Sequence, residues 1–237
     1  MKWLKDNTGR FPYRPFFSQD ELDYECEFLV TSHLSEKHGK VSFPIATNDL
    51  TIIVEKYSSD LDVYADLTKE GNDVEGITAF VPSKLPQVFI SQKLSGSPVF
   101  ENRFRTTLAH ELGHVKFHSF LLKDRQLSLF ANQDSSLVIK CMRDNIITTN
   151  KVDWMEWQAG YASGAFLMPI THIRNLVLAI CSKSNSSIHI MQTSATGRQL
   201  IEQVSATFQV SSEAARVRLS QLNFLIDSQL PEPFLKV

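Results

Sequence analysis

Two histidines four residues apart are the residues of this sequence best placed to bind a metal ion. His110 and His114 begin and end the segment HELGH. Residues four apart lie on the same side of a helix, with about 5–6 Å between their Cβ atoms. Both imidazoles could therefore reach one tetrahedral zinc ion at about 2.0–2.1 Å each. Glu111 projects from the edge of the same face, where its carboxylate could accept a proton from water without binding the metal. The competing interpretation is an amphipathic helix with ordinary surface or core histidines.

A catalytic zinc site usually needs a third protein ligand besides two histidines. His118 follows His110 by eight residues, which is about 12 Å along a continuous helix. The ligands of one zinc ion lie within about 4 Å of each other, so these two histidines could not share the ion. Glu156 is the preferred third ligand, because a His₂Glu set leaves the fourth position to water. Its competing role is the N3 carboxylate of a capping box that begins at Asp153, and Asp153 itself is the fallback ligand.

Three further side chains could support hydrolysis. His118 is interpreted as a residue that supports the ligands, lines the cleft or ends the helix. Together with Tyr161 and His172, it is also a candidate for stabilising the oxyanion that forms when a peptide bond is attacked. The sequence does not rank these three residues.

The candidate ligands lie on two predicted helices. Ser97 and Pro98 form an N-cap and N1 pair for the long helix that carries HELGH. The second helix begins after Asp153 and runs to residue 168. The small residues on one side of it are Ala159, Ala162, Ser163 and Ala165. Small side chains let two helices approach closely, which is needed if Glu156 is to reach a metal bound to the first helix.

Segments rich in β-branched and aromatic residues predict a small sheet. They are residues 61–66, 76–81 and 87–91, of which the last two are predicted to pair. An exposed sheet edge beside the metal could bind an extended peptide by strand addition. The alternative is that the sheet only covers the metal-binding helix.

The remaining segments before residue 150 are less uniform. A capping box, Ser18 to Glu21, predicts a helix that Gly39 can end, and a second short helix is predicted to follow residue 47. Residues 1–17 are predicted to be irregular. Residues 119–150 show no single period and are predicted to form short helices and loops.

Residues 198–219 read as a helix, a tight turn and a second helix, with Ser211 as the cap of the second. A helix that reads DNA needs basic and amide side chains on its exposed face. Here Arg216 and Arg218 are offset by Glu213 and Glu202. We therefore expect a structural helix pair, and direct DNA binding through residues 196–223 is the less favoured alternative.

Composition places the chain among globular proteins. It has 237 residues, 43% hydrophobic residues and a formal net charge of −2, which does not indicate a general surface for nucleic acid or anionic membranes. Three widely spaced cysteines form neither a disulfide framework nor a zinc knuckle. No signal peptide or long apolar run is visible, so we expect a cytoplasmic protein with no membrane partner.

Two motifs resemble those of the ImmA/IrrE family of metallo-endopeptidases. They are RTTLAHELGH followed by FH, and the segment EWQAGYASGAFLMP that begins at Glu156. The resemblance implies a cytosolic zinc enzyme that cuts a helix-turn-helix repressor and so regulates transcription. It also implies that His110 and His114 are ligands, that Glu111 is the catalytic acid and base, and that Glu156 is the third ligand.

The sequence departs from that family at two places. The family usually has Glu-Ala-Asn and then Phe-Ala in the second helix, whereas this chain has Gln158-Ala-Gly and then Tyr161-Ala-Ser. Gln158 removes one carboxylate that could have been a ligand, which favours Glu156 and leaves room for altered activity. A long insertion between His114 and Glu156 leaves room for unusual substrate choice.

These observations predict an α+β fold, with a mostly helical, zincin-like core, a small β-sheet and a C-terminal segment like a helix-turn-helix. The expected domains are an N-terminal arm (residues 1–17), a zinc metallopeptidase domain (18–182) and a C-terminal helical segment (183–237).

The predicted function is zinc-dependent cleavage of a cytosolic protein, with Zn²⁺ as cofactor and a helix-turn-helix repressor as substrate. The alternative is a zinc-containing regulatory protein that holds a repressor or DNA with little proteolysis. A third interpretation is a latent protease that awaits an activating signal.

Overall fold

The computed structural model describes residues 1–71, 73–80, 84–121, 137–142, 153–184 and 187–226. The chain divides into two compact units, residues 1–169 and 170–237. This division falls before the domain boundary expected between residues 182 and 183, and the expected domain limits stay a prediction.

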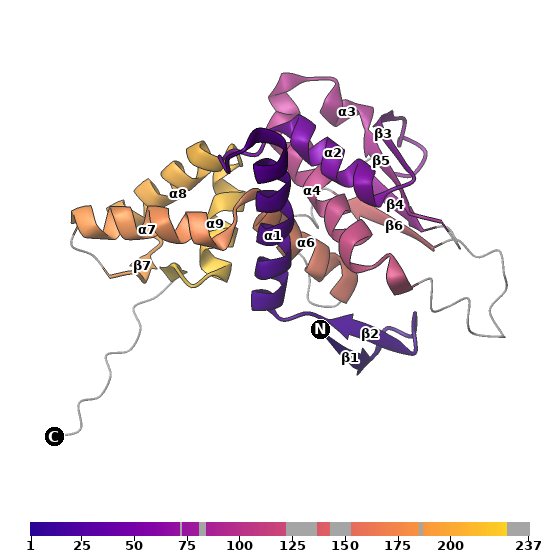
Figure 1. Cartoon of the computed structure of the whole chain (residues 1–237), viewed down its shortest axis with the longest axis horizontal. Coiled ribbons are helices and arrows are strands. Elements are labelled where there is room, and N and C mark those ends of the chain that lie inside the picture. The colour runs from indigo at the N-terminus through magenta and orange to yellow at the C-terminus, as the bar shows by residue number, and fades with distance from the viewer. Residues whose placement is uncertain (72, 81–83, 122–136, 143–152, 185–186, 227–237) are drawn as a thin grey trace. The chain divides into compact units, whose positions relative to one another are not determined.

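The first unit combines helices with short strands (Figure 1). Its helical elements are α1 (Gln19–His38), α2 (Thr47–Tyr57), α3 (Gln92–Ser95), a 3₁₀ turn η1 (Pro98–Phe100), α4 (Glu101–Phe117) and α6 (Trp154–Leu167). Its strands are β1 (Lys2–Lys5), β2 (Tyr13–Phe16), β3 (Asp60–Ala65), β4 (Val74–Phe80), β5 (Gln87–Ser91) and β6 (Leu137–Met142). This composition confirms the predicted α+β class with mostly helical structure.

Four of these strands form a mixed sheet in the order β3-β5-β4-β6. β4 pairs antiparallel with both β5 and β6, which confirms the predicted pairing of β4 with β5. β3 joins β5 in parallel. The prediction of helices and loops is wrong for residues 137–142, because β6 pairs along β4 with Ile139 buried and Val138 exposed. The rest of that region, residues 122–136 and 143–152, lies outside the described residues.

The first residues of the chain form a hairpin and not the predicted irregular arm. β1 and β2 pair antiparallel, with Trp3 opposite Pro15. Proline cannot donate a backbone hydrogen bond, so in a sheet it belongs on an edge strand. A two-stranded hairpin consists only of edges, and this explains why a segment rich in proline could still form strands.

α4 is the helix around which the first unit is packed. It contacts α6, α2 and the sheet strand β4, and α1 packs on α6 (Figure 1). Leu108 and Leu112 are fully buried on it, as expected for core positions. The predicted capping box of α1 is confirmed, because the Ser18 side chain accepts from the Glu21 backbone and Glu21 accepts from Ser18.

The contact between α4 and α6 depends on small residues. A β-carbon at Gly113 would lie 2.9 Å from the Ala159 Cα, closer than real side chains pack. The prediction that small residues let the two helices approach is therefore confirmed. The same contact brings the beginning of α6 beside the histidines of α4.

The second unit contains α7 (Ile170–Ser184), α8 (Ala195–Phe208), α9 (Ser212–Gln221) and the short parallel strands β7 (Ile190–Met191) and β8 (Leu225–Ile226). The predicted turn between α8 and α9 is confirmed, because Gln209 takes the left-handed conformation and Ser211 caps α9 by accepting from the Ala214 backbone. Arg216 pairs with Glu213 on the same helix, and Arg218 is buried. Among the described helices, none alone has the length and apolar character needed to cross a membrane, and α6 with α7 meets those criteria only as a bent pair.

Candidate metal centre

The two histidines of the HELGH segment lie one above the other on α4 and are fully buried. Their ring centroids are 4.9 Å apart, and the two Nε2 atoms are separated by 3.2 Å. One ring nitrogen of His110 and one of His114 therefore face the same point. This is the arrangement expected when residues four apart share one face of a helix.

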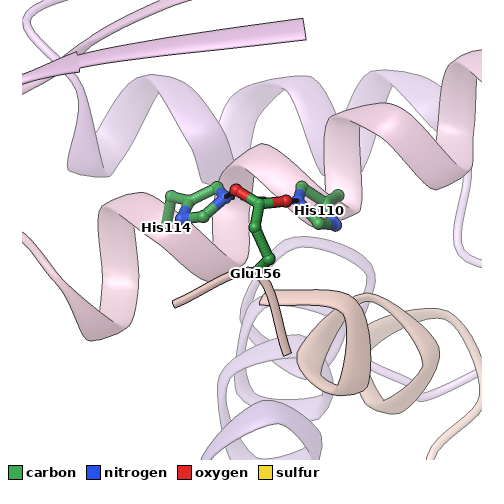
Figure 2. A group of neighbouring side chains, drawn as sticks. All are labelled: His110, His114 and Glu156. Atoms are coloured by element: carbon green, nitrogen blue, oxygen red, sulfur yellow. Dashed lines mark hydrogen bonds and ion pairs between the residues drawn. The ribbon is translucent and has the colours of Figure 1, made fainter. Parts of the chain in front are cut away.

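Glu156 reaches the same point from α6 (Figure 2). Its Oε2 atom is 3.3 Å from His110 Nε2, and its Oε1 atom is 3.3 Å from His114 Nε2. Asp153 caps α6 by accepting a hydrogen bond from the Met155 backbone. The Glu156 carboxylate lies between the two imidazoles and not at the helix terminus, so the expected capping-box role is not the one that the structure shows.

The three side chains fit a zinc ion. Tetrahedral ligands with bonds of about 2.0–2.1 Å lie about 3.3 Å from one another. The two Nε2 atoms of His110 and His114 are 3.2 Å apart, and each lies 3.3 Å from a different carboxylate oxygen of Glu156. One ligand atom from each of the three residues lies within 4.8 Å of the other two. Glu156 Oε2 is also a buried atom that has no hydrogen-bond partner among the described residues. The donor set, two imidazoles and one carboxylate, is one that catalytic zinc sites use.

Glu111 turns from the ligands towards the sheet. The Thr78 hydroxyl on β4 donates a hydrogen bond to Glu111 Oε2. A β-carbon at Gly76, on the same strand, would overlap with Glu111 Oε1 and would displace this carboxylate. Burial raises the pKa of Glu111, although the neighbouring His114 and His110 oppose that change. The fully buried carboxylate is thus held beside the metal-binding face without belonging to the ligand set.

Gly76 and Thr78 are site residues that the sequence analysis did not identify. An isolated glycine inside a strand pattern often marks a close approach of another group, and this signal was available at Gly76. The partner of such a glycine is not visible in the sequence, since Glu111 follows Gly76 by more than thirty residues.

His118 lies directly after α4 and contacts His114 at Nδ1, the ring nitrogen that does not face Glu156. Its Nδ1 atom is 3.0 Å from His114 Nδ1, and its Nε2 atom is 3.1 Å from Gln158 Oε1. Burial lowers the pKa of His118 well below its usual value. The interpretation of His118 as a supporting or helix-terminal residue agrees with this position, because its backbone N–H also caps α4.

Tyr161 and Asp153 make contacts outside the ligand cluster. The Tyr161 hydroxyl donates to Asp23 on α1 at 2.8 Å, a buried contact between α6 and α1. Asp153, the fallback ligand, accepts from Met155 and from Arg10 and is not part of the ligand cluster. His172 belongs to the second unit, so its role near the oxyanion stays a prediction.

The carboxylate of Glu156 is charged in this environment. Burial alone would raise its pKa, but the contacts with His110 and His114 outweigh burial and lower the pKa below its usual range. A negatively charged carboxylate between two imidazoles can bind a cation.

Comparison with known families agrees with this geometry. Residues 63–220, more than half of the chain, match the peptidase M78 family model described as the IrrE N-terminal-like domain. No curated protein sequence matches the chain. The match includes α4, β4 and α6, which carry all the residues of the candidate metal centre. The chain therefore belongs to the metallopeptidase family of the IrrE N-terminal-like domain.

Proposed function

We propose that this protein is a zinc-dependent endopeptidase. The observation that carries the proposal is the convergence of His110, His114 and Glu156, whose ligand atoms lie within 4.8 Å of one another next to the buried carboxylate of Glu111. Membership in a metallopeptidase family supports the same reaction class.

His110, His114 and Glu156 would hold the ion, which when bound supplies a Lewis acid that activates water and polarises the scissile carbonyl. Glu111 takes the proton from the attacking water and passes it to the leaving amine. The Thr78 hydroxyl holds one oxygen of that carboxylate, which leaves the other, Oε1, for proton transfer. The raised pKa of Glu111 suits a group that must both accept and release a proton.

We further propose a cytosolic helix-turn-helix repressor as the substrate. This proposal depends on the resemblance of the two motifs to the ImmA/IrrE family. The pairing of Arg216 with Glu213 and the burial of Arg218 leave α9 poorly suited to reading DNA. Those contacts favour a structural role for α8 and α9, so the repressor and not its operator would be the partner.

The test uses the full chain and a repressor encoded beside it, with and without a chelator. Wild-type protein is expected to cut the repressor, and chelation is expected to stop the cut. Glu111→Gln should retain zinc and lose about 10²–10⁴-fold in rate. Glu202→Gln, an exposed change on α8, is the matched control and should cut like wild type.

Repressor binding without cleavage by zinc-loaded wild-type protein would instead support the regulatory scaffold. Cleavage only after addition of a cellular extract would support the latent protease. Cleavage that survives in Glu111→Gln would contradict the assigned role of this residue.

A further inference from the structure

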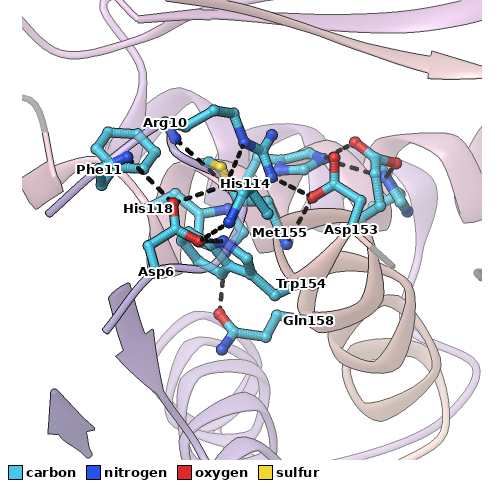
Figure 3. A network of polar contacts seen from close by, with 12 residues as sticks. Asp6, Arg10, Phe11, His114, His118, Asp153, Trp154, Met155 and Gln158 are labelled. Carbon is cyan, nitrogen blue, oxygen red and sulfur yellow. Dashed lines mark hydrogen bonds and ion pairs between the residues drawn. The ribbon is translucent and has the colours of Figure 1, made fainter. Parts of the chain in front are cut away.

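A line of buried polar contacts leads from the metal centre to the N-terminal hairpin (Figure 3). His114 Nδ1 lies 3.0 Å from His118 Nδ1, and His118 Nε2 lies 3.1 Å from Gln158 Oε1. Gln158 Nε2 in turn donates to the Pro15 carbonyl oxygen at 3.0 Å. His114, His118 and Gln158 are each at most 1% exposed, so their polar atoms depend on one another for hydrogen bonds.

The Pro15 carbonyl, at the end of this line, determines the direction of every hydrogen bond along it. The Pro15 carbonyl can only accept, so Gln158 must turn its NH₂ group towards it. Gln158 Oε1 then faces His118 and accepts a hydrogen bond from His118 Nε2–H. With Nε2–H directed at Gln158, neutral His118 carries its lone pair on Nδ1, the atom that faces His114 Nδ1 at 3.0 Å.

The same direction of hydrogen bonding continues from His118 to His114 in the metal centre. The lone pair on His118 Nδ1 accepts a hydrogen bond from His114 Nδ1–H. His114 then has its free lone pair on Nε2, the atom that faces Glu156 Oε1 and His110 Nε2. A histidine that binds zinc through Nε2 needs this tautomer.

His110 lacks the corresponding support. Its Nδ1 atom is buried without a hydrogen-bond partner among the residues that the structure describes. Among the described residues, a contact at Nδ1 therefore orients His114 but not His110. The contacts through His118 can for this reason be tested one residue at a time.

The hairpin end of the line is anchored on α6. Arg10 Nη2 donates to Asp153 Oδ1 at 2.6 Å, and Trp154 Nε1 donates to Asp6 Oδ1 at 3.2 Å. The Trp154 ring also packs at right angles on His118, with centroids 5.4 Å apart. These contacts fix the His118 ring. The hairpin residues precede residue 63, where the family match begins.

We propose that His118 and Gln158 are positioning residues that set the tautomer of His114, with the Pro15 carbonyl as the fixed end of the relay. The proposal rests on the proposed metal centre. It assigns the N-terminal hairpin a role in metal affinity, since it supplies the acceptor that orders the whole line.

The first test measures zinc affinity of the full chain by competition with a chromogenic chelator at constant pH. His118→Phe keeps a ring against Trp154 but removes the acceptor for His114, and it should weaken zinc binding about 10–100-fold. His118→Asn places an amide oxygen near the former Nδ1 position and should recover most of that loss. His189→Phe, an exposed change in the second unit, is the control and should bind like wild type.

The second residue is tested in the same way. Gln158→Leu removes the acceptor for His118 and should weaken zinc binding. Thermal unfolding of each metal-free variant reports whether it folds. Equal losses in His118→Phe and His118→Asn, or wild-type affinity in His118→Phe, would overturn the proposal.

A measurement independent of zinc affinity locates the protons themselves. Long-range ¹H–¹⁵N NMR of the imidazoles should show Nε2–H on His118 and Nδ1–H on His114, in zinc-loaded and metal-free protein. If wild-type protein binds no zinc, the proposed function fails, and the metal-free spectrum still decides whether the relay exists. A proton on His118 Nδ1 would overturn the relay in either state.

Discussion

Gly113 of α4 faces the backbone of Ala159 in α6 so closely that a β-carbon at residue 113 would lie 2.9 Å from the Ala159 Cα and 3.1 Å from its carbonyl oxygen. Backbone atoms cannot move aside as a flexible side chain can. The separation of the two helices, and with it the reach of Glu156 towards the imidazoles of α4, is therefore limited by this glycine.

Gly113→Ala is expected to push α6 away from α4. Overpacking of this kind destabilises a folded protein by about 1–3 kcal/mol, and the zinc dissociation constant should rise because Glu156 is displaced. Thermal unfolding and zinc competition measure the two effects. Ala179→Ser, a comparable change at an exposed site on α7, should leave both unchanged. Wild-type zinc affinity in Gly113→Ala would show that the contact does not position Glu156.

Glu156→Gln should remove the anionic ligand and with it the stabilisation of the folded protein by zinc. A ligand that binds only the folded state raises the unfolding temperature as its concentration rises. We expect this rise for wild type and for Asp153→Asn, because asparagine also caps helices and Asp153 is outside the ligand cluster. The unfolding temperature of Glu156→Gln should not respond to zinc. A zinc response lost in Asp153→Asn but kept in Glu156→Gln would reverse the assignment of the third ligand.

Thr78→Val tests the support of the catalytic base separately from the metal. The change keeps the shape of the side chain and removes the hydroxyl that donates to Glu111. Hydrogen bonds to charged groups contribute about 1.5–3 kcal/mol, so the rate of cleavage should fall about 10–100-fold. Zinc affinity should not change. Thr193→Val in the second unit is the control, and equal rates in both variants would exclude a role for Thr78.

Asp49 should make the folded protein sensitive to acid. Burial alone would raise its pKa, but hydrogen bonds from Lys37, His38 and His33 lower the pKa to about 2, from an ordinary value of 3.8. Because the pKa is lower in the folded protein, the stabilisation is complete above about pH 4 and is lost as pH falls towards 2. The difference corresponds to about 2 kcal/mol.

Urea unfolding of metal-free wild type and Asp49→Asn, measured between pH 2 and 6, checks this expectation. The variant should be less stable at pH 6, and the difference should disappear towards pH 2. Asp60→Asn, an exposed change on β3, should not show that pattern. A difference that stays constant with pH would mean that the Asp49 charge is not its cause.

The sequence was sufficient for those parts of the site that depend on local spacing. The helical period placed the two histidines of α4 together, and the small residues of α6 indicated a close contact that Gly113 and Ala159 make. The capping residues Ser18 and Ser211 also act as predicted, because a helix cap involves only neighbours in the chain.

The parts that could not be predicted depend on contacts between distant segments. β1 and β2 form strands because they pair with each other, and their proline and aromatic content did not indicate it. β6 exists as a strand because it pairs with β4, about sixty residues earlier. The partners of Glu111 on β4, and the contact of Gln158 with the Pro15 carbonyl, likewise follow from packing that no local pattern contains.

His110 and Glu111 are neighbours in the chain, yet one meets α6 and the other meets β4. Substitutions in α6 that displace Glu156 should weaken metal binding and leave Glu111 in place. Substitutions in β4 should leave the proposed metal ligands in place and impair Glu111 as a base. Substitutions confined to β4 should therefore separate metal binding from the proposed hydrolysis.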